Sequence, residues 1–371
     1  MQPHIDFFAA QERARRRTIM LIVPAVLALV VIIVLAYFLV VGCWWLMQDH
    51  KDYRQTVDAV EYLTGARAPA FVLWHPRLFF ATAVFTTLFI AGGSVYRIIE
   101  LGGQGGNFIA NRLGADVVRY DTTDLEERRL INIVEELSIA SGVRIPELFI
   151  LEEDGINSFC VGHDVDSAVL IITRGAVDVL NRDELQAVLA HEFSHILNAD
   201  MIINTRMVGV LHGLMMFTMT GRSLMLVRGW PFIAGVGFVA LGYVGNLLGT
   251  AIQAMICRQR EWLADAHAVQ FTRNPGAIVS ALKKIGGYHY NAYVPRPFAI
   301  ESAHMFFANA IENRRLLRTH PSLTNRIRAL EPGFGGVYPR VASERKATAQ
   351  TIRRVETHYR EAAKERGDYL R

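Results

Sequence analysis

Residues 181–200 have the sequence NRDELQAVLAHEFSHILNAD, and this stretch predicts the helix that identifies the class of fold. Asn181 followed three residues later by Glu184 is typical of a capping box at a helix N-terminus. We therefore expect a helix that runs from there to about Asn198. This helix is substantially apolar, so burying ionisable side chains on it costs free energy unless a metal or a partner compensates them. Its apolar positions are Leu185, Val188, Leu189, Ile196 and Leu197.

The same helix contains an H-E-x-x-H motif at residues 191–195. Four residues make about one helical turn, so His191 and His195 project from one face and can both coordinate Zn²⁺, with Glu192 beside the ion. Neutral imidazoles leave a coordination position for water, and a free carboxylate next to that water can accept its proton. The motif arises by chance in roughly 2% of chains of this length. Two surface histidines on an ordinary helix are therefore the alternative.

A second motif, Arg260-Glu261-Trp262-Leu263-Ala264-Asp265, supplies two acids one helical turn apart. Glu261 suits a third metal ligand, and Asp265 suits a carboxylate that orients a ligand histidine through its other ring nitrogen. An exposed helix with two solvated acids is the alternative interpretation.

Long uncharged segments predict a membrane protein. The chain has 371 residues, of which 51% are hydrophobic and 20% charged. Thr18 to Gln48 and Leu78 to Tyr96 contain no charged residue, and about 20 apolar residues suffice for one crossing. The first run is too long for a signal peptide and has no small-residue cleavage site. Met207 to Gly221 and Gly229 to Cys257 could form a membrane hairpin, lie in the interface or pack within the fold.

The charge pattern sets the expected orientation. Four arginines precede the first span (Arg13, Arg15, Arg16 and Arg17), which favours a cytoplasmic N-terminus and, after two crossings, a cytoplasmic domain beyond Arg97. His195 and Glu261 can meet at one ion only if zero or two crossings separate them, and both interpretations of the later hydrophobic pair satisfy this condition.

Other classes of function are disfavoured by composition. Cys43, Cys160 and Cys257 lie far apart, which leaves neither a disulfide framework nor a cysteine zinc cage. A net charge of +4 is a small excess spread along the chain, so nucleic-acid binding is not expected.

The ordered motifs resemble the HtpX-like membrane zinc metallopeptidases, whose clan also contains the CAAX prenyl proteases. The resemblance covers about residues 100–330. It rests on three stretches: the H-E-x-x-H motif with Asn198 and Asp200, then residues 260–265, and then His320-Pro321-Ser322-Leu323-Thr324-Asn325-Arg326-Ile327.

The resemblance implies a gluzincin-type site with one Zn²⁺ per chain. The implied ligands are His191, His195 and Glu261. Glu192 is the implied general base, and Asp265 is the implied carboxylate that orients a ligand histidine. Asn157-Ser158-Phe159 stands where relatives often have Asn-Ala-Phe beside the cleft, which implies a substrate contact at Asn157; Ser158 departs from that pattern. His320 and Arg326 match positions near the family's site. They are candidate stabilisers of the oxyanion, with a structural cap or salt bridge as the alternative.

We expect an α+β fold, mostly helical, in a multi-pass membrane protein whose cytoplasmic metallopeptidase domain contains a small β-sheet. A helix is predicted at Asp124 to Ala140, and strands at Pro146 to Leu151 and Ala168 to Thr173. The expected organisation is a cytoplasmic N-terminus (1–17), two transmembrane helices with an extracytoplasmic connection (18–99), the first part of the metallopeptidase domain (100–205), a hydrophobic helical hairpin (206–257), the second part of that domain (258–338) and a charged helical tail (339–371).

The expected activity is endoproteolysis of protein or peptide substrates by metal-activated water. An extended peptide could pair with an edge strand such as Ala168 to Thr173. The HtpX resemblance suggests quality control of damaged or misfolded membrane proteins at a bacterial inner membrane. The alternatives are a non-cleaving zinc-binding membrane scaffold, a CAAX-type processing protease and a non-peptidase zinc hydrolase.

Overall fold

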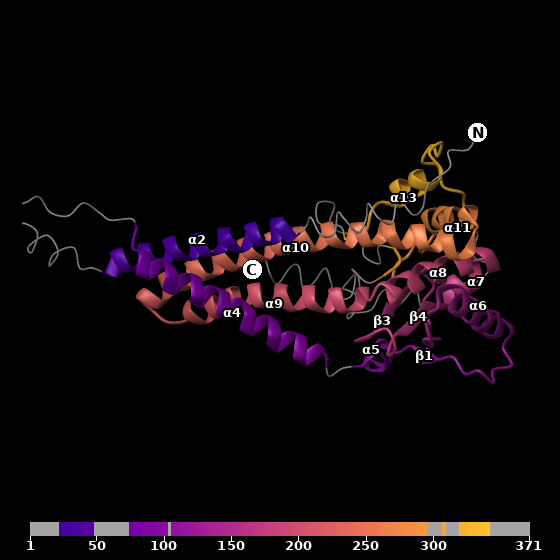
Figure 1. The fold of residues 1–371 in the computed structure, drawn as a ribbon, viewed down its shortest axis with the longest axis horizontal. Coiled ribbons are helices and arrows are strands. Elements are labelled where there is room, and N and C mark those ends of the chain that lie inside the picture. Colours follow the sequence, from indigo (N-terminus) through magenta and orange to yellow (C-terminus); the bar gives the residue numbers. More distant parts are fainter. Residues whose placement is uncertain (1–21, 48–73, 103–104, 295–305, 309–318, 342–371) are drawn as a thin grey trace, which may run out of the picture. The chain divides into compact units, whose positions relative to one another are not determined.

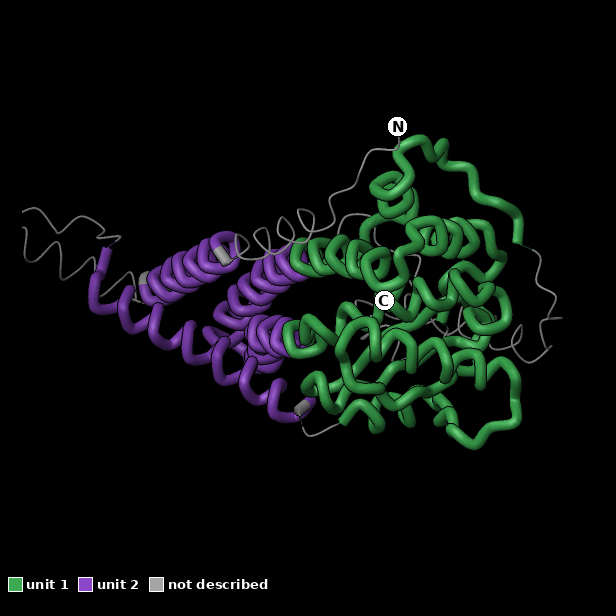
Figure 2. Tube along the Cα trace, turned by 45° about the vertical axis from the view of Figure 1, so that its right-hand side comes forward, with its two compact units in different colours: residues 1–19, 102–204, 254–371 green, residues 20–101, 205–253 purple. Residues whose placement is uncertain are grey.

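A computed structural model describes residues 22–47, 74–102, 105–294, 306–308 and 319–341. The predicted N-terminal segment 1–17 and nearly all of the predicted charged tail lie outside these ranges. The chain divides into two compact units, coloured separately in Figure 2. Unit 1 comprises residues 1–19, 102–204 and 254–371, and unit 2 comprises residues 20–101 and 205–253.

Unit 2 is built from helices that are long and apolar enough to cross a bilayer. They are α2 (Ile22–Met47), α4 (Pro76–Gly102), most of α9 (Asp200–Leu224) and the first part of α10 (Trp230–Thr272) (Figure 1). The two ambiguous hydrophobic stretches therefore lie within helices of sufficient length, except for Gly229, which directly precedes α10. The described part of the chain has four such helices, as expected for a multi-pass membrane protein.

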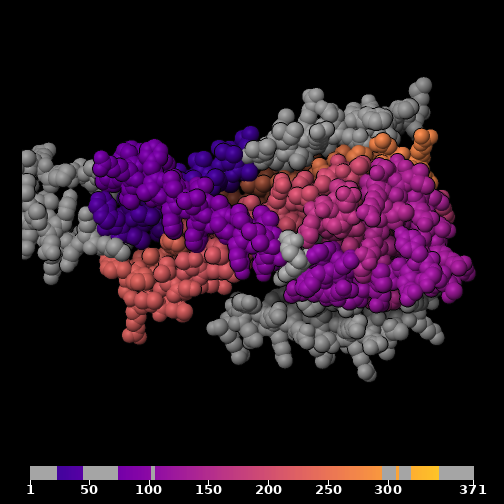
Figure 3. Space-filling view, turned by 60° about the horizontal axis from the view of Figure 1, so that its bottom comes forward, coloured from indigo at the N-terminus to yellow at the C-terminus, as the bar shows by residue number. Residues whose placement is uncertain are grey.

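Large apolar side chains remain exposed on α4, whose surface is purple in Figure 3. Leu88 is 66% exposed and Ile99 is 68% exposed. In a bilayer the acyl chains would cover such side chains, so their exposure fits a membrane helix. The inward-facing residues of this unit form a small core: Ile32, Ala36, Ile90, Leu214, Phe217 and Leu241.

Helices α4 and α9 approach closely because small residues lie between them. A Cβ added at Gly213 would lie 2.3 Å from the Ile90 carbonyl oxygen and 2.5 Å from Ser94 Oγ. The Ser94 hydroxyl donates to the Ile90 carbonyl in turn. Only glycine fits at this contact, as in other close helix pairs in membranes.

Unit 1 contains a four-stranded sheet in the order β1-β2-β4-β3. Its strands are β1 (Asp116–Val117), β2 (Glu147–Leu151), β3 (Ser158–Val161) and β4 (Val169–Thr173). Strands β2 and β4 are parallel, and β1 and β3 pair antiparallel to β2 and β4 respectively.

The expectation that Ala168 to Thr173 forms an edge strand is wrong, because β4 lies between β2 and β3 and β3 forms the edge. All five residues of β4 are buried. A continuous apolar run of this kind is typical of an interior strand that is covered on both faces.

Helices cover both faces of the sheet. Alternate strand residues, such as Ile150 and Ile172, pack with α6 (Leu125–Ser141), α8 (Arg182–Leu197) and α11 (Pro275–Gly287). The opposite face packs against α5 (Gly106–Leu113). Two further helices complete the unit: α7 (Arg174–Val179) and α13 (Leu323–Leu330).

The two helices predicted in this region are confirmed. Asp124 caps α6 by accepting hydrogen bonds from the backbone N–H groups of Glu126 and Glu127. Helix α8 begins with the expected capping box, in which Asn181 and Glu184 each accept a hydrogen bond from the other's backbone N–H. The C-terminal part of α10 belongs to the same unit and carries Glu261 and Asp265.

Candidate metal centre

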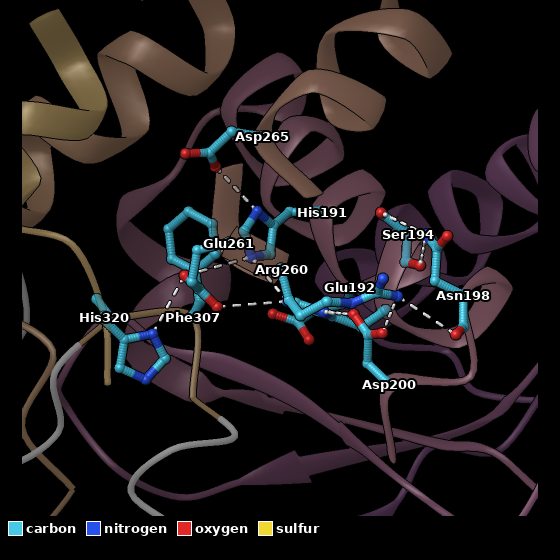
Figure 4. Close-up of polar contacts among 12 residues, drawn as sticks. His191, Glu192, Ser194, Asn198, Asp200, Arg260, Glu261, Asp265, Phe307 and His320 are labelled. Atoms are coloured by element: carbon cyan, nitrogen blue, oxygen red, sulfur yellow. Dashed lines mark hydrogen bonds and ion pairs between the residues drawn. The ribbon is translucent and has the colours of Figure 1, made fainter. Parts of the chain in front are cut away.

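The two motif histidines face each other through their outer ring nitrogens. His191 Nε2 and His195 Nε2 lie 3.1 Å apart, and Figure 4 shows His191 beside Asp265 and Glu261. Their Nδ1 atoms point to carboxylates: His191 Nδ1 is 2.9 Å from Asp265 Oδ1, and His195 Nδ1 is 2.8 Å from Asp200 Oδ2. Because a carboxylate can accept the hydrogen of each Nδ1, each imidazole in its neutral form would present its Nε2 lone pair to a metal ion.

Glu261 completes a three-residue group. One of its carboxylate oxygens lies 3.5 Å from His195 Nε2, and the other lies 3.8 Å from His191 Nε2. In a tetrahedral zinc site the donor atoms are about 3.3 Å apart. Among the described residues these three side chains form a group that could hold a metal ion, with all ligand atoms within 4.8 Å of one another.

The two candidate ligand histidines have different pKa values when no metal is bound. Burial lowers the pKa of His191 to about 4, so this imidazole is neutral at physiological pH. Burial also acts to lower the pKa of His195, but hydrogen bonds to Asp200 and Glu261 outweigh it and raise that pKa to about 10. Without a metal, His195 therefore holds a proton that a bound ion would replace.

Glu192 is completely buried beside this group. Its Oε1 accepts a hydrogen bond of 2.8 Å from the Ser158 hydroxyl, whereas its Oε2 has no hydrogen-bond partner among the described residues. Burial raises the pKa of the Glu192 carboxyl to about 7. A buried carboxylate with one unoccupied oxygen and a pKa near neutrality can exchange a proton with a substrate or water.

Arg326 lies behind the ligands and is fully buried. Its Nε donates to Asp265 Oδ2 at 2.9 Å, its Nη2 donates to Asp265 Oδ1 at 2.6 Å, and its Nη1 donates to the Phe307 carbonyl at 2.6 Å. Nη1 is also 3.4 Å from Glu261 Oε2. The guanidinium thus contacts Asp265, which lies against His191, and Glu261, which belongs to the possible metal-binding group.

The other predicted contacts also lie in this region. His320 Nδ1 is 3.1 Å from Glu261 Oε2, and His320 is buried. The Asn157 amide is engaged by its own chain, since Nδ2 donates to the Ala292 and Ala308 carbonyls. The structure therefore brings all the predicted site residues into unit 1, and a substrate contact at Asn157 and an oxyanion role for His320 or Arg326 stay predictions.

Sequence reasoning assigned no role to two side chains that support the site. Ser158 donates to Glu192, and Asp200 accepts from His195 and forms an ion pair with Arg260. Asp200 reaches His195 because Ala199, with φ of 52°, turns the chain between α8 and α9. The short spacing from His195 to Asp200 could have indicated that the two side chains meet. The left-handed backbone conformation of Ala199, which makes this contact possible, cannot be predicted from the sequence.

Comparison with known proteins agrees with this geometry. The model of the family described as "Peptidase family M48" matches residues 124–332, a range that includes both motifs that carry the candidate metal ligands. The chain is 33% identical over 214 residues to a "Protease HtpX homolog" of Dictyoglomus turgidum, covering 54% of this chain and 68% of that protein. It is 30% identical over 274 residues to a "Protease HtpX homolog" of Lactobacillus acidophilus, covering 68% of this chain and 88% of that protein.

A further "Protease HtpX homolog", from Thermoanaerobacter pseudethanolicus, is 35% identical over 221 residues, which cover 54% of this chain and 71% of that protein. The family match spans more than half of the chain, and the apolar helices of unit 2 are those of a membrane protein. The chain therefore belongs to peptidase family M48, as an HtpX-like membrane metallopeptidase.

Proposed function

We propose that the chain is a zinc-dependent endopeptidase in which His191, His195 and Glu261 hold one Zn²⁺ and Glu192 acts as general base. The observation that carries the proposal is the convergence of two imidazole Nε2 atoms and the Glu261 carboxylate beside a buried glutamate with one unoccupied oxygen. Two imidazoles and a carboxylate are a common ligand set for catalytic zinc. When bound there, zinc supplies Lewis acidity to a peptide carbonyl and to water.

The residues of the chain have separate tasks in this reaction. Glu192 accepts a proton at Oε2 from the attacking water and returns it to the leaving nitrogen. Asp265 and Asp200 hold the His191 and His195 rings in the orientation that directs Nε2 towards the ion. The protein forms no covalent intermediate with the substrate.

Substrate pairing is assigned to β3, the edge strand next to Glu192, in place of the interior strand β4. An extended peptide could add to this edge through main-chain hydrogen bonds. The Phe307 backbone N–H donates to the Ser158 carbonyl, so the segment 306–308 lies at the start of this edge, and the pairing is proposed for the part of β3 that follows Ser158.

The substrates we propose are exposed segments of damaged or misfolded membrane proteins, cleaved on the cytoplasmic side of a bacterial inner membrane. Support comes from the likeness to HtpX homologues and from the arginines before the first span. A CAAX-type processing role is less well supported, because those relatives enclose the site within a larger set of spans than the four helices described. A scaffold without activity would not need the Glu192 carboxylate.

The test compares casein cleavage and zinc content in wild type and Glu192→Gln, purified in detergent. Gln cannot accept the proton, so cleavage should fall by at least about a hundredfold while one zinc per chain is retained. Glu135→Gln, an exposed residue of α6, is the matched control and should cleave normally. Normal turnover by Glu192→Gln would refute the general-base assignment, and a wild type that binds zinc without cleaving would support the scaffold.

A further inference from the structure

Ser158 is the first residue of β3, and its position is fixed by hydrogen bonds on several sides. The residue is completely buried. Its backbone N–H donates to Asn157 Oδ1 at 3.0 Å, and its carbonyl accepts from the Phe307 N–H at 2.8 Å. The backbone that carries the Ser158 hydroxyl is therefore held in place by its neighbours.

The hydroxyl of Ser158 forms a hydrogen bond with the Glu192 carboxylate. Ser158 Oγ donates to Glu192 Oε1 at 2.8 Å, and Glu192 is itself completely buried on α8. A glutamate side chain has several rotatable bonds, and a hydrogen bond from a fixed donor restricts it to one orientation. The two carboxylate oxygens are thereby made different: Oε1 is occupied, and Oε2 has no hydrogen-bond partner among the described residues.

Without this hydroxyl, Glu192 could turn towards other charged groups. His195 and Arg326 attract its carboxylate, and Glu261 repels it. A carboxylate drawn towards a cation would be displaced from the water that it must deprotonate, and small displacements of a catalytic group lower the rate strongly.

We propose that Ser158 is a positioning residue for Glu192: it occupies Oε1 and so presents Oε2 as the oxygen that exchanges the proton. The inference rests on the proposed role of Glu192 as general base. Ser158 acts through Glu192 and has no part in metal binding.

The test is Ser158→Ala, with kcat and KM measured on a fluorogenic peptide that the wild type cleaves. Loss of one hydrogen bond to the base should lower kcat by about tenfold. KM should change by less than about twofold, because the hydroxyl donates its hydrogen bond to Glu192 and does not contact the substrate. Zinc content should remain at one per chain.

Ser280→Ala is a closely matched control. The Ser280 hydroxyl also donates to a buried glutamate of α8, Glu184 Oε1, at 2.6 Å, but at the capped N-terminal end of the helix. Both variants lose one hydroxyl-to-carboxylate bond, so both should lower the melting temperature by a few degrees. Only Ser158→Ala should lower kcat.

The proposal is overturned if kcat of Ser158→Ala stays within about twofold of wild type, if its KM rises as much as its kcat falls, or if Ser280→Ala reproduces the loss. The comparison with Glu192→Gln separates this inference from the proposed function. An inactive Glu192→Gln together with a fully active Ser158→Ala would overturn only the role of Ser158, whereas an active Glu192→Gln would overturn both.

Discussion

Replacing Arg326 by Met should destabilise unit 1 strongly, because it leaves a buried carboxylate without its charged partner. Arg326 is fully buried and makes two hydrogen bonds to Asp265, of 2.6 Å and 2.9 Å. It also donates to the Phe307 carbonyl, and its guanidinium carbon lies 4.4 Å from the centre of the Phe307 ring. Met preserves much of the length of the side chain and removes every one of these polar contacts.

The size of the effect follows from the burial of the ion pair. Breaking a buried pair by removing one partner costs about 3–5 kcal/mol, which lowers the melting temperature of a domain of this size by about 6–20 °C. Most of this cost is the unpaired charge of Asp265. Asn at position 265 carries no charge and can still accept the hydrogen bond from His191 Nδ1. The double variant Arg326→Met, Asp265→Asn should therefore recover at least about half of the loss.

The assay is thermal unfolding of wild type, both single variants and the double variant, in detergent and without metal so that metal binding does not mask the difference. If Arg326 instead acts only on the oxyanion, Arg326→Met should lower kcat and leave the melting temperature unchanged. A melting temperature within about 2 °C of wild type, or additive losses in the double variant, would refute the reasoning from the buried pair.

Three other outcomes are expected. Asp200→Asn removes the charge that holds His195 Nδ1, so zinc affinity measured by chelator competition should fall by about 10- to 100-fold, and an unchanged affinity would contradict this role. Because burial raises the pKa of Glu192 while a bound cation would lower it, we expect the base to become protonated on the acid side of neutrality; kcat/KM should then fall by about tenfold per pH unit, and a profile that stays flat down to about pH 4 would exclude Glu192 as the titrating base. Gly213→Ala should lower thermal stability because its Cβ meets the α4 backbone, whereas Gly92→Ala, with open space around its Cβ, should not; equal stability of the two would contradict the close contact of α4 and α9.

Local signals predicted the helices well, and they identified three side chains that the structure brings together as a possible metal-binding group. The capping box of α8 is formed by two neighbouring side chains, and the four-residue spacing of His191 and His195 depends only on helix geometry. The same spacing on α10 places Glu261 and Asp265 on one face. These features are visible in a sequence because each is contained within a few residues of one helix.

Features that depend on contacts between distant segments could not be predicted. The sequence predicts a strand at Ala168 to Thr173, but the place of β4 between β2 and β3 depends on pairing with β3, a strand that the sequence pattern did not predict. The contact between Ser158 and Glu192 joins an edge strand to a helix 34 residues further along the chain. The hydrogen bonds from Arg326 to Asp265 join two helices 61 residues apart.

The most direct test of the metal centre is the zinc content of wild type, Glu192→Gln and Glu261→Gln after dialysis against a weak chelator, measured by inductively coupled plasma mass spectrometry. Wild type and Glu192→Gln should each retain one zinc per chain, and Glu261→Gln should retain close to none, because Glu261 supplies the third ligand and Glu192 supplies none. Full zinc occupancy in Glu261→Gln, or loss of zinc from Glu192→Gln, would contradict the proposed ligand set.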